Sequence, residues 1–450
     1  MIPVIYRLRA IGHSLSNKTR LFVFFVFLLI PAFSGAITLD ECIHTALKLN
    51  PDLEAMTFRV EAARAAHQQA RSNWYPQLAL SGNYTRTNNP AQAFMMALNQ
   101  ERLDMTAPGF DPADPGNTHN IRVSLGVEYL LFDGGRSRAG EQITRHEIEI
   151  SSYARDAAKN ALVYEVVNGY YNVMKAEDLV TVFRKTTGSI EKSLRMARER
   201  LEHGTVVRTD VLNLQVQLAQ AHEDLMQAEN NFLFSIDMLN TAIGADIVKP
   251  GKLTRPPEQP PALSDIHIGE ETVSRRPELQ AAVLSMQSKK LALRQSRRGY
   301  LPHMTAFGSL DVDRYPSDEF QESYIFGVRA GWDIFDGFAR SGAVSEARAR
   351  RNESVAMLKN IRNQLELDLK EARLRVSNAG KRLDVTRTGL ESAAESLRIT
   401  RERYEKGAVG ITELLTAQTA FTTSEARNRV AHYEFLKALA NMDRATGKSR

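Results

Sequence analysis

Residues 365–404 read LELDLKEARLRVSNAGKRLDVTRTGLESAAESLRITRERY. Apolar or small side chains recur in this stretch at steps of four and three, from Leu365 and Leu369 without a break to Leu397 and Tyr404. A seven-residue repeat sustained over such a length is typical of a coiled-coil helix. Because Arg, Lys and Glu fill the flanking positions, the stretch predicts a long amphipathic helix that packs along one apolar seam.

The same pattern occurs earlier in the chain at a constant offset of 203 residues. The seam recurs from Leu162 to Leu201, and Phe-Asp-Gly at 132–134 recurs at 335–337. The sequence after each seam also matches, since Arg200 to Gly204 corresponds to Arg403 to Gly407. Self-similarity at a fixed offset indicates a duplicated structural unit, so we expect two long helices.

The offset is larger near the start of each copy. Pro76 and Pro302 lie 226 residues apart, so the first copy has 23 extra residues between Pro76 and Phe132. We place the extra residues in the Pro- and Asn-rich stretch from Asn88 to Asn117 and expect one long loop there.

These markers divide the chain into a leader at 1–36, repeats at 37–248 and 266–450, and a joining segment at 249–265. The joining segment contains five prolines, which helix interiors and central strands do not tolerate. Each repeat is expected to contain a helix, a β-hairpin, a long helix and a return helix. The hairpins are placed at residues 77–132 and 303–335.

Each long helix is expected to reach roughly 100 Å, because about 70 residues separate the Phe-Asp-Gly marker from the next turn. The return helices have about half that length. The segments Asp52 to Ser72 and Glu278 to Arg297 are also expected to be helical. We therefore expect two shorter helices, stacked end to end, against each long helix.

The apolar period changes from about 3.6 to 2 in residues 121–131 and 324–334, which predicts strands with one apolar face. Their hairpin partners are expected at Leu78 to Thr85 and Met304 to Asp311. If the strands belong to a membrane barrel, the side chains predicted to face its lumen are Arg122, Glu128, Arg329 and Asp333. Those predicted to face lipid are Val123, Leu125, Val127, Phe326, Val328 and Trp332.

Strands of about ten residues with one apolar face match a transmembrane barrel strand. Alternation alone fits a soluble β-sandwich equally well. However, hairpins at one end of long rods have no second sheet to cover them, whereas a bilayer covers an apolar face. Since a bilayer excludes open sheet edges, the four strands must close with strands of other chains, and hydrogen bonding permits eight, twelve or sixteen.

The leader has four basic residues, no acidic residue and the apolar run Leu21 to Ile30 before Ser34-Gly35-Ala36, as in a cleaved export signal. The other 54 of 58 Lys and Arg residues nearly balance 53 acidic residues, so no nucleic-acid partner is expected. The sole cysteine, Cys42, excludes an internal disulfide; we expect a buried thiol without a lipid anchor.

No cluster of residues indicates an enzyme, a cofactor or a metal site. The ten histidines are scattered without metal-ligand spacing, and Gly134-Gly135 lies outside any phosphate-binding motif. Asp311 and Asp313 are expected in a hairpin turn rather than in a catalytic pair. A periplasmic coiled-coil structural or adaptor protein is the alternative to a channel, since both would be exported and have long helices.

From Ile37 to Gly447 the chain resembles the TolC-like outer membrane efflux protein family. The resemblance rests on the duplicated order of elements, the Tyr75-Pro76 and Leu301-Pro302 strand entries, the Phe-Asp-Gly exits and the matching turns. It implies a mainly α protein with a β-barrel contribution: a homotrimer with one twelve-stranded barrel in the outer membrane and a helical periplasmic tube. It also implies coupling through a periplasmic adaptor to an inner-membrane pump or ABC transporter, in tripartite efflux or type I secretion.

The resemblance also assigns roles to residues at the far end of the tube. The adaptor would meet the turns at Gly204, Thr205, Gly407 and Ala408. A periplasmic gate would involve Tyr404, Asp210 and Glu413. Val409 and Thr416 stand where well-known members have a basic partner and a second acidic ring. Independently of the family, the glycines are expected as turn formers and Asp210 as a helix cap.

Overall fold

The computed structural model describes residues 36–106, 111, 113–255, 270–316 and 318–448. The leader, except Ala36, and most of the joining segment therefore lie outside the described residues. The first repeat contains α2 (Leu39–Leu49), α3 (Pro51–Arg71), the 3-10 turn η1 (Ser72–Trp74), β1 (Gln77–Thr87), α4 (Pro90–Asn99), β2 (Thr118–Phe132), α5 (Arg136–Glu202) and α6 (Arg208–Ile243). The second contains α7 (Glu270–Ser274), α8 (Pro277–Arg298), β3 (His303–Arg314), β4 (Gln321–Gly331), α9 (Ala339–Glu405) and α10 (Ile411–Ala445).

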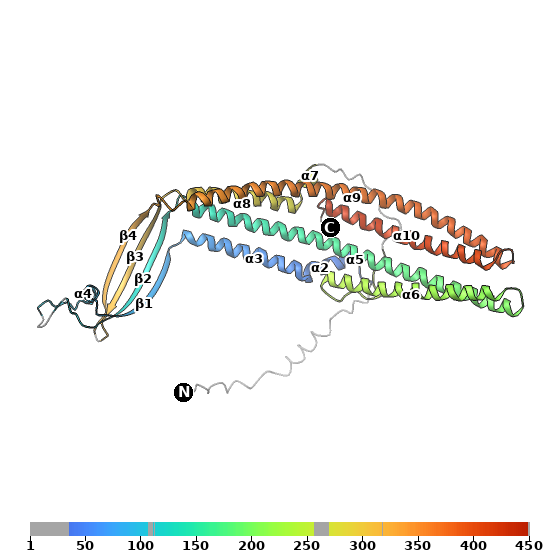
Figure 1. Cartoon of the computed structure of the whole chain (residues 1–450), viewed down its shortest axis with the longest axis horizontal. Coiled ribbons are helices and arrows are strands. Elements are labelled where there is room, and N and C mark those ends of the chain that lie inside the picture. The colour runs from blue at the N-terminus through green and yellow to red at the C-terminus, as the bar shows by residue number, and fades with distance from the viewer. Residues whose placement is uncertain (1–35, 107–110, 112, 256–269, 317, 449–450) are drawn as a thin grey trace, which may run out of the picture.

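The molecule is elongated, with the four strands at one end and two helical hairpin turns at the other (Figure 1). The long helices α5 and α9 each have 67 residues. All predicted seam positions on both helices are buried or half-buried, as the repeat requires. At Gly169, a small seam residue, the Leu239 side chain of α6 approaches to 3.1 Å from where a Cβ would lie. The expected fold class is confirmed.

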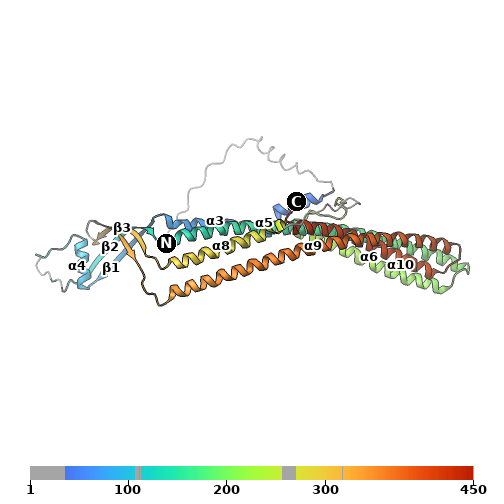
Figure 2. The same cartoon turned by 90° about the horizontal axis from the view of Figure 1, so that it is seen from above.

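Each long helix is covered by two shorter ones. Along α5 lie α3 and then α6, and along α9 lie α8 and then α10 (Figure 1). In addition, α8 and α10 both contact α5, so the two repeats form one curved layer of helices (Figures 1 and 2). Among the helices of the described residues, none combines the length and the apolar character that a membrane crossing requires.

The ends of the shorter helices are joined by polar side chains. Asn50 caps α3 by accepting a hydrogen bond from the Leu53 N–H (3.1 Å), and its amide donates to the Ala242 carbonyl at the end of α6 (2.9 Å). In the second repeat, the Arg276 guanidinium donates to the carbonyls of Arg444 (3.1 Å) and Ala445 (3.0 Å) at the end of α10. Both joints satisfy carbonyls that a helix end leaves unpaired.

The Phe-Asp-Gly markers begin the long helices. The Asp133 carboxylate accepts hydrogen bonds from the backbone N–H of Gly135 (2.8 Å) and Ser137 (2.6 Å), and Asp336 accepts from the Arg340 N–H (3.0 Å). Burial alone would raise the pKa of Asp133, but these hydrogen bonds stabilise the carboxylate and lower the pKa overall. Each aspartate thus satisfies backbone N–H groups at the start of a long helix that would otherwise lack a partner.

The two hairpins form one antiparallel sheet in the order β1-β2-β3-β4. The register aligns Leu80 of β1 with Leu125 of β2, and Leu125 with Leu310 of β3. Directly opposed residues of antiparallel strands project to the same face, so this register aligns the apolar positions of neighbouring strands.

Three local expectations were wrong. The stretch from Asn88 to Asn117 contains α4, because Asn89 and Pro90 start a helix in a run of Ala, Met and Leu. Asp311 and Asp313 lie inside β3, not in the turn. Finally, β4 ends at Gly331 and does not extend to residue 334 as expected. Its partner β3 begins at His303, which lies opposite Gly331, so residues 332–334 have no strand to pair with.

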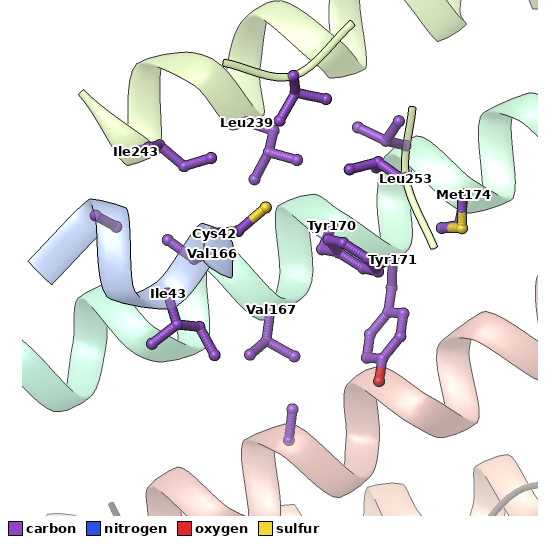
Figure 3. Close-up of a cluster of buried hydrophobic side chains, with 14 of the residues drawn as sticks. Cys42, Ile43, Val166, Val167, Tyr170, Tyr171, Met174, Leu239, Ile243 and Leu253 are labelled. Atoms are coloured by element: carbon purple, nitrogen blue, oxygen red, sulfur yellow. The ribbon is translucent and has the colours of Figure 1, made fainter. Parts of the chain in front are cut away.

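A buried cluster lies midway along the helices. Side chains of α2, α5 and α6 converge there with Leu253 of the segment after α6 (Figure 3). Cys42 is fully buried in this cluster, and burial raises the pKa of its thiol to about 12. Nearby, the buried Asp178 carboxylate accepts a hydrogen bond from Tyr433 of α10 (3.0 Å) and pairs with Arg255 (3.3 Å). These contacts fasten both repeats together.

Candidate functional site

The register gathers the polar strand residues on one face of the sheet. Arg122 of β2 lies opposite Asn83 of β1 and Asp313 of β3. This mostly polar face includes Gln77, Ala79, Ser81, Asn83, Thr85, Thr87, Asn120, Arg122, Ser124, Gly126, Glu128, Leu130, Thr305, Phe307, Ser309, Asp311, Asp313, Gln321, Ser323, Ile325, Gly327 and Arg329. Three predicted lumen residues, Arg122, Glu128 and Arg329, are therefore on a common face.

Asp333, the fourth, lies beyond the end of β4. It lines a cavity of about 440 Å³ at the junction of sheet and helices, together with Asp133, Arg136 and His303. Asp333 therefore belongs to the rim of the sheet and not to its face.

Two aspartates of the polar face were not recognised from the sequence. The Arg122 Nε donates to Asp313 at 2.9 Å, Asn120 also donates to Asp313, and Ser124 donates to Asp311. Asp313 is only 1% exposed, so this hydrogen-bond network is a buried part of the sheet. The signal was present, since Asp311 and Asp313 continue the period-two series of Thr305 and Ser309 along β3.

The opposite face of the sheet is apolar and exposed. The exposed fractions of Leu80, Tyr324 and Phe326 are 74, 73 and 79%. The other large apolar residues of this face are Leu78, Tyr84, Ile121, Val123, Leu125, Val127, Tyr129, Met304, Leu310, Val312 and Val328. An exposed apolar patch of this extent marks a surface that another apolar phase or partner covers.

Trp332 lies past the end of β4, although the sequence placed it on this strand. Its exposed indole donates a hydrogen bond to the Tyr300 carbonyl at 3.0 Å. Tyr300 and Tyr75 are also exposed at this end of the sheet. Aromatic side chains with one polar end are favoured at membrane–water interfaces.

The sheet has two open edges. In the strand order β1-β2-β3-β4, the outer strands β1 and β4 each have one neighbour among the described residues. The outward backbone groups of β1 and β4 therefore have no strand partner within one protomer.

The two helical hairpin turns at the far end are alike. Gly204 and Gly407 have φ of +71° and +73°, which favours glycine, and open space surrounds both. The Thr205 N–H donates to the Arg200 carbonyl and the Ala408 N–H to the Arg403 carbonyl, both at 2.9 Å. All four predicted contact residues, Gly204, Thr205, Gly407 and Ala408, are exposed.

Near these turns, Tyr404 is buried and does not face solvent. It is 4% exposed within a cluster that joins α5, α6, α9 and α10, and its hydroxyl has no hydrogen-bond partner among the described residues. The Arg200 guanidinium lies 5.1 Å from the Tyr404 ring and donates to the Glu405 carbonyl at 3.4 Å. The structure thus places Arg200 against Tyr404.

The predicted acids lie around this cluster. Asp210 is half-buried in the first turn of α6, and Glu413 is exposed in the first turn of α10. Negative charge in the first turn of a helix is favourable. Within the described residues, no group of three or more His, Cys, Asp and Glu side chains is placed to hold a metal ion.

Comparison with known proteins gives a consistent result. The chain is 24% identical over 418 residues to the outer membrane protein OprJ of Pseudomonas aeruginosa, covering 89% of this chain and 83% of that one. The structure superposes on the crystal structure of a membrane protein from Pseudomonas aeruginosa with a TM-score of 0.80 at 23% identity, covering 91% of this chain and 93% of the other. For the Campylobacter jejuni CmeC outer membrane channel, the TM-score is 0.79 at 16% identity, covering 99 and 94%.

At these identities the solved structures establish the fold alone. The model of one family, described as outer membrane efflux protein, matches residues 42–245 and 268–448, which is most of the chain. The two matched stretches correspond to the two structural repeats. The chain belongs to the outer membrane efflux protein family.

Proposed function

We propose that this chain is one subunit of a trimeric outer-membrane channel, the exit duct of a tripartite efflux or type I secretion system. The observation that carries the proposal is the sheet, which has an exposed apolar face, a polar face and two open edges. Such a sheet is stable in a bilayer only if lipid covers the apolar face and both edges find strands. The channel passes its substrates without changing them.

Closure is compatible with the strand directions. Adjacent strands are antiparallel throughout, so β4 of one subunit runs antiparallel to β1 of the next in any ring of copies. Three copies supply twelve strands. At a spacing of about 4.8 Å and a tilt of about 40°, twelve strands enclose a ring about 25 Å across. Arg122, Glu128 and Arg329 would line this water-filled lumen.

The helical hairpin turns are the proposed docking points for the periplasmic adaptor, which would connect the channel to an inner-membrane pump or ABC transporter. Gly204, Thr205, Gly407 and Ala408 are exposed, and the two turns have the same conformation. Each subunit thus offers two similar contacts. Thr205→Cys and Ala408→Cys should crosslink to the adaptor in intact cells.

The proposed gate lies next to these turns. Packing of Tyr404 beneath Arg200 fastens the end of α9 to the end of α5. Asp210 and Glu413 place negative charge at the same level. In this proposal, the Tyr404 ring holds the two hairpins together and the acids determine which ions pass.

The alternative, a periplasmic structural or adaptor protein, is not favoured, because such a protein has no use for an apolar sheet face of this size. Cysteines on neighbouring residues of β1 separate the two functions. In intact outer membranes, Ser81→Cys on the polar face should react with a water-soluble maleimide, whereas Leu80→Cys should be protected by lipid. Equal reactivity at both positions would exclude the channel.

A further inference from the structure

The helix α4, in the insertion of the first hairpin, lies at the outer end of the sheet, away from the long helices (Figure 1). The helix ends where Glu101 adopts a φ of +53° and the Arg102 N–H donates to the Ala97 carbonyl at 2.9 Å. A positive φ is unfavourable for a residue with a side chain. Contacts of Arg102 hold this turn: an ion pair with Asp318 (2.7 Å) and a guanidinium 3.8 Å from the Tyr315 ring centre.

The helix α4 lies on the polar side of the sheet. The Gln100 amide donates to the Asn120 side chain at 2.9 Å and to the His119 carbonyl at 2.8 Å. Asn120 has the same strand parity as Arg122, so its side chain belongs to the polar face. The Thr87 hydroxyl, which has the parity of Thr85 and Asn83, donates to Gln92 of α4 at 3.1 Å.

These contacts continue the buried network of the channel wall. Gln100, Asn120 and Asp313 are 3, 4 and 1% exposed, and Asn120 donates to Asp313. Asp313 in turn accepts from Arg122. The end of α4 is therefore fixed to β2 and β3 by a continuous chain of buried polar groups, which holds the helix in one place.

The helix turns an apolar side away from the sheet. Ala93 and Gln100 are seven residues apart on the buried side. Met95 and Leu98, three residues apart, lie on the opposite side and are 55 and 43% exposed. In a closed barrel, a helix on the polar face directs its far side toward the barrel axis.

We propose that the three copies of α4 meet near the axis through Met95 and Leu98 and constrict the outer mouth of the channel. The occupant of this apolar side is thus a second copy of the same helix. Size supports the contact, since three helices of about 10 Å diameter nearly fill a ring of about 25 Å. The inference rests on the proposed trimeric channel.

Crosslinking at Leu98→Cys tests the contact. Cys42 is the only native cysteine and is fully buried, so the new thiol is the only accessible one. With a short bis-maleimide, Leu98→Cys and Met95→Cys should give covalently joined subunits on denaturing gels, and the crosslinked channel should conduct less. The matched control is Tyr324→Cys, at the same end of the sheet on the apolar face, which should give none.

A second variant measures the constriction itself. Replacing Met95 and Leu98 with Asp should separate the helices and raise single-channel conductance by about twofold or more, because the helices occupy most of the opening. A conducting trimer without crosslinks and with unchanged conductance would overturn the constriction but leave the channel intact. If only a lipid-soluble maleimide labels Leu98→Cys, α4 lies in the bilayer, and this result would also overturn the constriction. A wild-type protein that does not conduct would remove the proposed function and the constriction together.

Discussion

The guanidinium of Arg276 occupies the joint between α8 and α10, where the residue is 3% exposed. It donates to two backbone carbonyls and to Glu278 (2.8 Å), and also to Asp368 (3.3 Å). Removing it would leave the two carbonyls at the end of α10 and the half-buried Glu278 carboxylate without this donor. Arg276→Ala is therefore expected to lower the free energy of unfolding by about 3 kcal/mol. Thermal unfolding in detergent, followed by circular dichroism, measures this.

The matched control is Arg375→Ala. Arg375 makes an exposed ion pair with Glu371 one helical turn away on α9, so its loss should cost about 0.5 kcal/mol or less. Equal losses for the two variants would contradict the structural role of Arg276.

The same joint predicts a pH dependence. Burial opposes ionisation of Glu278, but hydrogen bonds from Arg276 prevail and hold the pKa of Glu278 below its usual 4.5. A lowered folded-state pKa means that the stabilisation is complete above about pH 4.5 and is lost as the pH falls through the folded-state pKa. Glu278→Gln should therefore weaken the acid destabilisation. An unchanged acid profile would show that this carboxylate does not contribute.

Tyr404 allows the role of its ring to be separated from that of its hydroxyl. Because the buried hydroxyl has no partner, Tyr404→Phe should leave stability unchanged or raise it, by up to about 1 kcal/mol. Tyr404→Ala removes a buried ring and should cost about 3 to 5 kcal/mol and increase conductance. Unfolding and planar-bilayer recordings compare the two variants. Loss of stability in Tyr404→Phe would indicate that a neighbouring subunit binds the hydroxyl.

Two glycines with similar φ angles, Gly204 and Gly244, have different surroundings. Gly244 ends α6 with φ +80°, and a Cβ there would lie 2.7 Å from the Leu49 carbonyl oxygen. Gly204 has φ +71° in open space. Gly204→Ala should cost about 1 kcal/mol for the left-handed backbone alone. Gly244→Ala should cost clearly more, because the joint with α2 and α3 must also shift.

Both variants can be compared in one thermal unfolding series in detergent. Equal destabilisation by Gly204→Ala and Gly244→Ala would mean that the backbone around Gly244 can move to accept a Cβ, which would contradict the tight contact with Leu49 in the structure. A larger effect at Gly204 would contradict the exposed turn.

The long helices were predictable because the seven-residue repeat that forms them is visible in the local sequence. The duplicated order also followed from local markers, and the strand faces from period-two alternation. The end of β4 was not predictable in this way, because it depends on where β3 begins, at His303. Asp311 and Asp313 continue the period-two series of β3, but local preference for a turn outweighed that signal, and their partners Ser124 and Arg122 lie on another strand.

Sequence signals for some missed features were present but weak. Asn89-Pro90 before a run of Ala and Met is an ordinary helix start, yet the surrounding Pro and Asn residues favoured a loop. The contact of Arg200 with Tyr404 joins residues 204 positions apart, which no local pattern reports. The buried hydroxyl of Tyr404 is likewise a property of tertiary packing.

The helices and the sheet of this molecule have different requirements for a partner. The helices bury or half-bury their seams within one protomer, whereas the sheet leaves an apolar face and two edges uncovered. The helical part is therefore expected to fold within the single chain, and the sheet to be completed only by lipid and by sister subunits. This division explains why one chain carries only four strands of a barrel.

Pairing of β4 with β1 of the neighbouring subunit tests this requirement most directly. Cysteine pairs on the polar face, Ser81→Cys on β1 with Ser323→Cys or Ile325→Cys on β4, would scan the register in protein purified from outer membranes. Opposed residues of neighbouring strands lie close enough for a disulfide. At one register, oxidation should give a covalent trimer as the largest product, and the single variants should give none. Monomers in every combination, from a protein that stays dissolved without detergent, would contradict a shared barrel.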